Sequence, residues 1–242
     1  MSEKGNQAVK TVSFMMLITL FGKILGMVRE QLLAANYGTD MQAAAFLLAS
    51  RIPRTFFDVI FASAISASFI PVFVEYLQKK GRQEAFSLAN RFITMISTVT
   101  LLMMLLGMAF AKPLTLLIAP GYDVETVTLC VGLLRMLFPT MLFTAVAFSF
   151  VGILQSLEEF NVPAALSVVS NGVLILYYIF FNEKFGILGL TVAFLIGWAM
   201  QAVIQIPSLW KKGYHYHPDF HFKDEGLRKI GKLMLPVMVS TW

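Results

Sequence analysis

The sequence predicts an all-α, polytopic membrane protein in which six transmembrane helices form one lobe and a seventh helix begins. Hydrophobic residues make up 57% of the 242 positions and charged residues only 14%, whereas a soluble domain has about 25% charged residues. The mean hydropathy is +0.73. Long apolar runs recur along the chain, and most of the cations lie between them. These features indicate the membrane class.

Six stretches are long enough to cross a bilayer, because a helix needs about 20 apolar residues to span a core about 30 Å thick. They are Thr11–Ala35, Met41–Glu75, Phe92–Phe110, Thr126–Ile153, Val162–Phe181 and Ile187–Ile206. We expect a six-helix lobe over residues 1–210 and a cytoplasmic loop over 211–229. Residues 230–242 are expected to form the truncated start of a seventh helix, which suggests a fragment of a longer protein.

Local signals refine these stretches. The first has Lys4 before an apolar run, as a secretory signal does, but it lacks a good cleavage site, so we expect it to be retained as a span. The second is too long for one straight helix, and Pro53 and Pro71 are expected to bend it. Pro139 is expected to bend the fourth.

The distribution of Lys and Arg predicts the orientation, because cytoplasmic loops carry an excess of these residues. Twelve cations fall on the side that contains the N-terminus: Lys4, Lys10, Lys79, Lys80, Arg82, Arg91, Lys211, Lys212, Lys223, Arg228, Lys229 and Lys232. The other side has two, Lys112 and Lys184. The N-terminus is therefore expected in the cytoplasm. The net charge of +5 reflects this asymmetry, and we expect membrane lipids and no nucleic acid as partners.

Charged side chains inside the apolar stretches are the main functional signal. Five of them are cations: Lys23, Arg29, Arg51, Arg54 and Arg135. Each costs about 2.5–3.5 kcal/mol near the centre of a membrane helix. Glu30 and Asp58 are the carboxylates of the same stretches that could pair with them. Because the cations outnumber these carboxylates, the pattern favours a polar cavity that receives an anion.

The spacing of the second-stretch charges supports one shared site. Arg51, Arg54 and Asp58 are separated by three and then four residues, which places them within about 60° on one face of a helix. Lys23 falls at a similar membrane depth on the first helix. Guanidinium groups suit phosphate because their fork binds two oxygens at once. An alternative reading is that ion pairs such as Arg29 with Glu30 serve only to fix helix packing.

Other features are less specific. Gly22 and Gly26 form a GxxxG pattern, which allows close helix approach. Arg135 could line the cavity or extend toward the outer headgroups. The three histidines between Gly213 and Phe222 are expected to belong to an interfacial loop, with no metal bound. No nucleophile elbow, Walker loop or HExxH motif occurs, so we expect neither an enzyme nor a cofactor.

Short motifs along almost the whole chain resemble the amino-terminal half of the MurJ/MviN flippase family, which belongs to the superfamily of multidrug, oligosaccharidyl-lipid and polysaccharide exporters. The first-helix pattern is Gly22-Lys23-Ile24-Leu25-Gly26 followed by Arg29-Glu30 and Tyr37-Gly38. Further landmarks are Ile52-Pro53, Phe69-Ile70-Pro71-Val72 with Glu75-Tyr76, Ala119-Pro120-Gly121, Leu133-Leu134-Arg135 with Phe138-Pro139, and Val162-Pro163-Ala164.

The resemblance implies a lipid II flippase of the bacterial cytoplasmic membrane that works by alternating access around a cationic cavity between two lobes. It implies that Arg29 and Lys23 belong to that cavity. From their position on the helix, we expect Arg51 and Arg54 to bind the diphosphate of lipid II together with Arg29 and Lys23, with Glu30 and Asp58 as counter-charges. Lys23 stands where many members have arginine, and a further arginine of the family falls at Phe57. A C-terminal lobe is expected in the full-length protein. The alternatives are export of another polyprenyl-linked polysaccharide or of drugs, or an inactive fragment.

Overall fold

The computed structural model describes residues 3–57 and 65–240, and within them every regular element is helical. The elements in chain order are α1 (Glu3–Tyr37), α2 (Met41–Phe57), the π-helical turn η2 (Ile65–Phe69), α3 (Ile70–Lys79), α4 (Arg82–Ala109), α5 (Ala111–Ile118), α6 (Val124–Leu137), α7 (Thr140–Ser156), α8 (Asn161–Ala164), α9 (Leu166–Phe180), α10 (Asn182–Val203), α11 (Ile206–Lys211) and α12 (Glu225–Ser240).

Five helical segments of the described chain have the length and apolarity of membrane spans. They are Val12–Tyr37, Arg82–Ala109, Val124–Ser156, Asn161–Phe180 and Asn182–Lys211. These segments correspond to all the predicted stretches except the second, so the predicted all-α membrane fold is confirmed. The second stretch, Met41–Glu75, is divided among α2, η2 and α3, and residues 58–64 within it lie outside the description. The total of six spans therefore stays a prediction.

Prolines mark several of the helix breaks. α6 ends at Leu137 and α7 begins at Thr140, so the predicted interruption at Pro139 is confirmed. Pro71 lies in the first turn of α3, where its missing N–H leaves no helical hydrogen bond unmade. Pro53 lies inside α2 without ending it. The long apolar stretches are thereby divided into shorter helices whose ends contact neighbouring elements.

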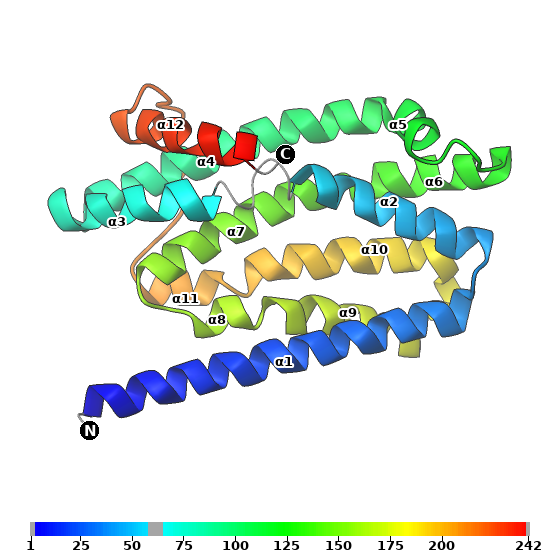
Figure 1. Ribbon diagram of the computed structural model, residues 1–242, viewed down its shortest axis with the longest axis horizontal. Helices are drawn as coiled ribbons and strands as arrows, with labels where there is room; N and C mark the ends of the chain where they lie inside the picture. Colours follow the sequence, from blue (N-terminus) through cyan, green and yellow to red (C-terminus); the bar gives the residue numbers. More distant parts are fainter. Residues whose placement is uncertain (1–2, 58–64, 241–242) are drawn as a thin grey trace.

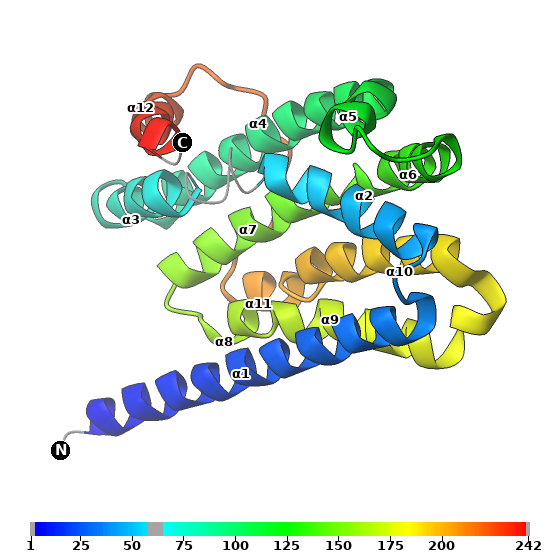
Figure 2. The same cartoon turned by 45° about the vertical axis from the view of Figure 1, so that its right-hand side comes forward.

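The helices lie in layers that Figures 1 and 2 show from two sides. α1, α9 and α10 form one side of the lobe, α3, α4 and α12 form the other, and α2 and α7 lie between them. The start of α1, the end of α3 and α11 share one end of the lobe. The end of α1 and the α5–α6 connection lie at the opposite end. The prediction of orientation assumes this same distribution of segment ends between the two ends of the lobe.

Two buried apolar clusters hold the layers together. One joins α3, α4, α7 and the start of α12, where Phe69 stacks on Phe92 with 4.4 Å between ring centroids. The other joins α1, α2, α6, α9 and α10. Leu227 and Ile230 of α12 are buried in the first cluster. The beginning of the seventh helix is therefore packed against this lobe.

The GxxxG pattern lies where α1 crosses α9. A Cβ atom added to Gly22 would come within 2.2 Å of the Ser167 Oγ atom. The Asn171 side chain donates to the Gly22 carbonyl at 3.2 Å, next to Gly26. Because glycine has no side chain, the two backbones approach closely enough for this interhelical hydrogen bond. The close approach predicted for this motif is confirmed.

Replacing Gly22 by valine is expected to destabilise the protein by about 1–3 kcal/mol, because the new methyl groups overlap Ser167. Thermal unfolding in detergent measures the effect. Gly172→Val is the matched control, since a Cβ atom at Gly172 of α9 meets nothing within 4 Å. Equal unfolding temperatures for Gly22→Val and Gly172→Val would contradict the proposed role of this contact.

A polar clasp fixes the segment before α12 to α4. We use this name for Arg91, Asp219 and Asp224: the Arg91 guanidinium donates to Asp219 at 2.9 Å and to Asp224 at 2.5 Å. Tyr214, which is buried, donates to Asn90 at 2.8 Å. The Asp224 carboxylate also accepts from the amides of residues 226 and 227, so it caps the first turn of α12. α12 accordingly begins at Glu225, ahead of Ile230.

The clasp sets a dependence on pH. Hydrogen bonds from the backbone amide and the side chain of His221, together with Arg91, lower the pKa of Asp219 to about 2 from its ordinary 3.8. Because the folded state favours the ionised carboxylate, its contribution to stability is present above about pH 4 and is lost as the pH falls toward 2.

We therefore expect the difference in unfolding temperature between wild type and Asp219→Asn to shrink as the pH falls from about 4 to 2. Thermal scans of the two detergent-solubilised proteins over this range measure it. A difference that is the same at pH 5 and pH 2 would show that ionisation of Asp219 does not stabilise the fold.

Candidate functional site: a cation-lined cavity in the lobe

A cavity of about 450 Å³ opens between α1, α2, α9 and α10. Its volume falls within the range of about 300–1,000 Å³ that is typical of small-molecule sites. The polar side chains and the aromatic rings that line it are Arg29, Glu30, Ser50, Arg51, Arg54, Phe46, Tyr178, Phe194 and Trp198. The remaining lining residues are mostly aliphatic, so the charged groups lie in an apolar frame.

α1 supplies Arg29 and Glu30. The Arg29 guanidinium contacts the Glu30 carboxylate at 3.2 Å, while the Glu30 side chain stays 72% exposed. An ion pair as exposed as this contributes little to stability. The end of α1 is fixed independently, because Tyr37 donates to Asn182 at 2.5 Å and Asn182 donates to Asn36 at 2.8 Å. These contacts with the start of α10 set the position of Arg29.

α2 supplies Ser50, Arg51 and Arg54. The buried residues Ala49 and Ile52 point to the packed side of this helix. Arg51 and Arg54 are three residues apart and both line the cavity. The helix is therefore amphipathic in the sense predicted from spacing, with its charged stripe toward the cavity and its apolar side toward α6.

The described part of the lining has a net positive charge. Among the residues that the structure describes, it contains three guanidinium groups and one carboxylate. An isolated cation in an apolar environment is costly, so an anionic ligand that forms charge-assisted hydrogen bonds with these groups offsets part of that cost. Each guanidinium offers a planar fork of donors that matches two phosphate oxygens. The cavity is thus suited chemically to a phosphate or a diphosphate.

The other predicted site residues lie elsewhere. Lys23 is exposed on α1 and is not part of the cavity lining. It precedes Arg29 by six residues, which turns it about 240° around the helix axis. Asp58 lies outside the described residues. Arg135 donates to the Met108 carbonyl at 3.2 Å, so it satisfies a free carbonyl at the end of α4, away from the residues that line the cavity.

Charge-based reasoning did not identify the aromatic part of the site. Tyr178 of α9 and Trp198 of α10 come from apolar stretches without charged residues. Neither side chain is costly to place in a membrane, so the search for charges did not single them out. Phe194 and Trp198 are four residues apart on one face of α10. That spacing is the sequence signal that could have indicated them, but buried packing produces the same pattern.

The histidine-containing loop forms no metal cluster. His221 contacts Asp219 at 2.7 Å, and Asp219 in turn belongs to the polar clasp. Among the described residues, no group of three His, Cys, Asp or Glu side chains is arranged to hold a metal ion.

Comparison with known proteins decides the family. The family described as lipid II flippase MurJ matches residues 33–241. The chain belongs to this family. A probable lipid II flippase MurJ from Buchnera aphidicola subsp. Acyrthosiphon pisum is 31% identical over 228 residues, which cover 93% of this chain and 45% of the relative. The lipid II flippase MurJ from Burkholderia cenocepacia is 26% identical over 197 residues, which cover 80% and 38% of the two chains.

Solved structures agree with this assignment. The inward closed conformation of lipid II flippase MurJ is similar with a TM-score of 0.77 and 25% identity, over 94% of this chain and 47% of that one. The bent form of the Vibrio cholerae MATE transporter VcmN has a TM-score of 0.76 at 16% identity, over 98% and 54% of the two chains, which shows a shared fold. The chain spans about half the length of the curated MurJ relatives it matches.

Proposed function

We propose that the protein moves lipid II, the undecaprenyl-diphosphate-linked precursor of peptidoglycan, from the inner to the outer leaflet of the bacterial cytoplasmic membrane. The observation that carries this proposal is a cavity with three guanidinium groups inside a lobe of membrane-spanning helices. Membership of the MurJ family supports lipid II as the particular anion. The proposed activity is transport, with no bond made or broken.

In this proposal Arg29, Arg51 and Arg54 bind the diphosphate. Its oxygens accept charge-assisted hydrogen bonds that are stronger than neutral ones. Glu30 acts as a counter-charge when the ligand is absent, since it already contacts Arg29. Lys23 is left out of the binding set because it lies on another face of α1.

Transport requires two states that bind the ligand from opposite sides of the membrane. We propose that a second lobe faces this cavity and that the two lobes rock about it, as expected for transporters with a binding site near the midplane. The length of the MurJ relatives supports a second lobe. The twelve Lys and Arg residues on the N-terminal side support a cytoplasmic N-terminus, because cytoplasmic loops carry an excess of these residues.

The similarity to MATE transporters raises drug export as a second candidate. A cationic drug is best held by a cavity with a net negative charge. The lining residues that the structure describes carry a net positive charge. The charge of the site therefore favours an anionic glycolipid over a cationic drug, although the fold serves both groups of transporters.

Removal of one cavity arginine is expected to reduce outward movement of lipid II about 10–100-fold, since a hydrogen bond to a charged group contributes about 1.5–3 kcal/mol. The variants are Arg29→Ala and Arg51→Ala, with Arg51→Lys to separate charge from fork geometry. Leaflet-resolved accessibility of lipid II is measured in cells depleted of their own flippase and supplied with the protein at its full natural length.

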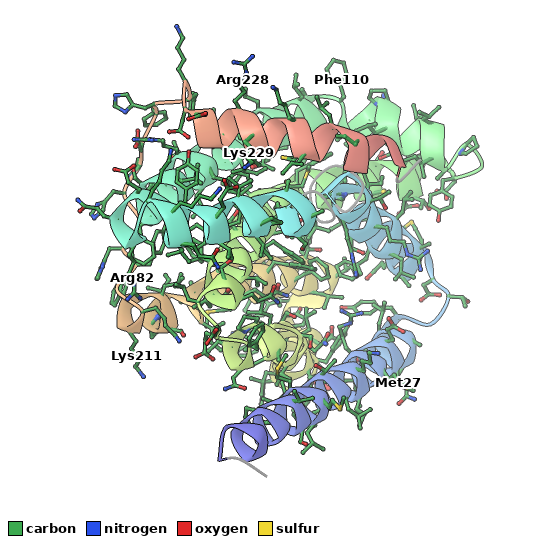
Figure 3. The ribbon with its side chains drawn as sticks, turned by 60° about the vertical axis from the view of Figure 1, so that its left-hand side comes forward. Met27, Arg82, Phe110, Lys211, Arg228 and Lys229 are labelled. Atoms are coloured by element: carbon green, nitrogen blue, oxygen red, sulfur yellow. The ribbon has the colours of Figure 1, made fainter. Side chains whose placement is uncertain are left out.

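Arg228→Ala is the matched control, because Arg228 extends from α12 away from the cavity (Figure 3). It is expected to transport as wild type does. If wild type restores no outward lipid II, the proposed substrate is wrong. If Arg29→Ala and Arg51→Ala both work as well as wild type at equal expression, these guanidinium groups do not bind the substrate.

A further inference from the structure

Aromatic side chains of α10 and α2 form part of the cavity wall. Trp198 is half-buried and lines the cation-lined cavity. Its ring lies 5.9 Å from that of Phe194, measured between centroids, and Phe194 in turn meets Phe46 of α2 edge-to-face at 5.8 Å. This row of rings connects α10 with α2. The indole is therefore supported from one side by aromatic contacts.

Backbone packing fixes the position of this indole. The preceding residue, Gly197, is buried where α10 meets α9, and a Cβ atom there would lie 3.1 Å from the Ser170 carbonyl oxygen. The two helices are thus in close backbone contact at this level. Because successive residues are about 100° apart on a helix, Trp198 turns away from α9. Its place in the cavity follows from this contact.

Trp198 also borders a second, smaller hollow of about 60 Å³. Trp198, Arg54, Ser50 and Phe194 line both spaces, so the two adjoin. A group held by the Arg54 guanidinium therefore lies in the same space as the indole. The small hollow can take a substituent of a larger ligand but is too small for a sugar ring.

The hydroxyl groups that line the small hollow can act toward a ligand as hydrogen-bond acceptors. Ser50 donates to the Leu47 carbonyl at 3.0 Å, Thr140 to the Leu137 carbonyl at 2.6 Å, and Thr144 to the Thr140 carbonyl at 2.7 Å. Since each hydroxyl hydrogen is used on a backbone carbonyl three or four residues earlier in the chain, the oxygens are left as acceptors. The hollow therefore suits a ligand group that donates hydrogen bonds, such as a sugar hydroxyl or an acetamido N–H.

We infer that Trp198 is a stacking surface for the sugar ring attached to the diphosphate. This inference rests on the proposed function. In a polyprenyl-diphosphate-linked glycan the first sugar is bonded directly to a phosphate, so a diphosphate bound at Arg51 and Arg54 brings that ring into the space bordered by Trp198. The apolar C–H face of the ring packs on the indole, and a hydrogen-bond donor on the ring enters the small hollow.

Two ligands separate sugar recognition from phosphate recognition: lipid II, and undecaprenyl diphosphate, which has no sugar. Dissociation constants are measured for both with the purified protein at its full natural length in nanodiscs. Trp198→Ala is expected to weaken lipid II binding about 5–10-fold, the scale of an aromatic contact, and to change undecaprenyl diphosphate binding less than about 2-fold. Trp198→Phe is expected to retain most of the lipid II affinity.

Controls assign each outcome. Arg51→Gln is expected to weaken both ligands, and Trp210→Ala neither, because Trp210 is exposed on α11 and stacks on His215 outside the cavity. If Trp198→Ala weakens the binding of both ligands equally, or of neither, the proposal that Trp198 stacks on the sugar is wrong, while the proposal of diphosphate binding stands. If wild type binds neither ligand, the proposed function fails and the sugar surface with it.

Discussion

The structure depends on the cost of placing cations among membrane-spanning helices. Three guanidinium groups in one lobe are unfavourable unless they reach water, a counter-ion or a ligand. The fold meets this constraint by turning the charged stripe of α2 away from α6 and toward α1, α9 and α10, where a cavity separates the helices. The close contact of Gly22 with α9 and the Tyr37–Asn182 hydrogen bond then hold α1, and Arg29 with it, beside that cavity. The need to keep the arginine side chains out of the apolar core therefore accounts both for the position of the cavity and for the side on which α2 packs.

Much of this arrangement could be predicted from short-range patterns. The separation of Arg51 and Arg54 by three residues placed them on one face of a helix, and both line the cavity. Pro139 indicated the division between α6 and α7. These predictions need only the geometry of a single helix, which depends little on its neighbours.

Features that depend on distant contacts could not be predicted in this way. Lys23 precedes Arg29 by six residues, which places it about 9 Å away along α1 and about 240° around it, so it lies outside the cavity lining. Arg135 contacts the end of α4, and its partner could be identified only once the packing of α4 and α6 was known. Trp198 carries no charge, so nothing in its stretch distinguished it from a packed aromatic residue. Arg91 counted as one more cytoplasmic cation, although its partners Asp219 and Asp224 follow more than a hundred residues later.

The polar clasp has a mechanical consequence. The segment between α11 and α12 is anchored through Arg91, and the first turns of α12 are anchored through Leu227 and Ile230. Pro236 then interrupts the hydrogen-bonding ladder inside α12. A helix bends most easily where a backbone hydrogen bond is missing, and in α12 that position follows the buried residues Leu227 and Ile230. The segment from α11 to the first turns of α12 is therefore expected to move with α4 as one unit, and a bend within α12 is expected near Pro236.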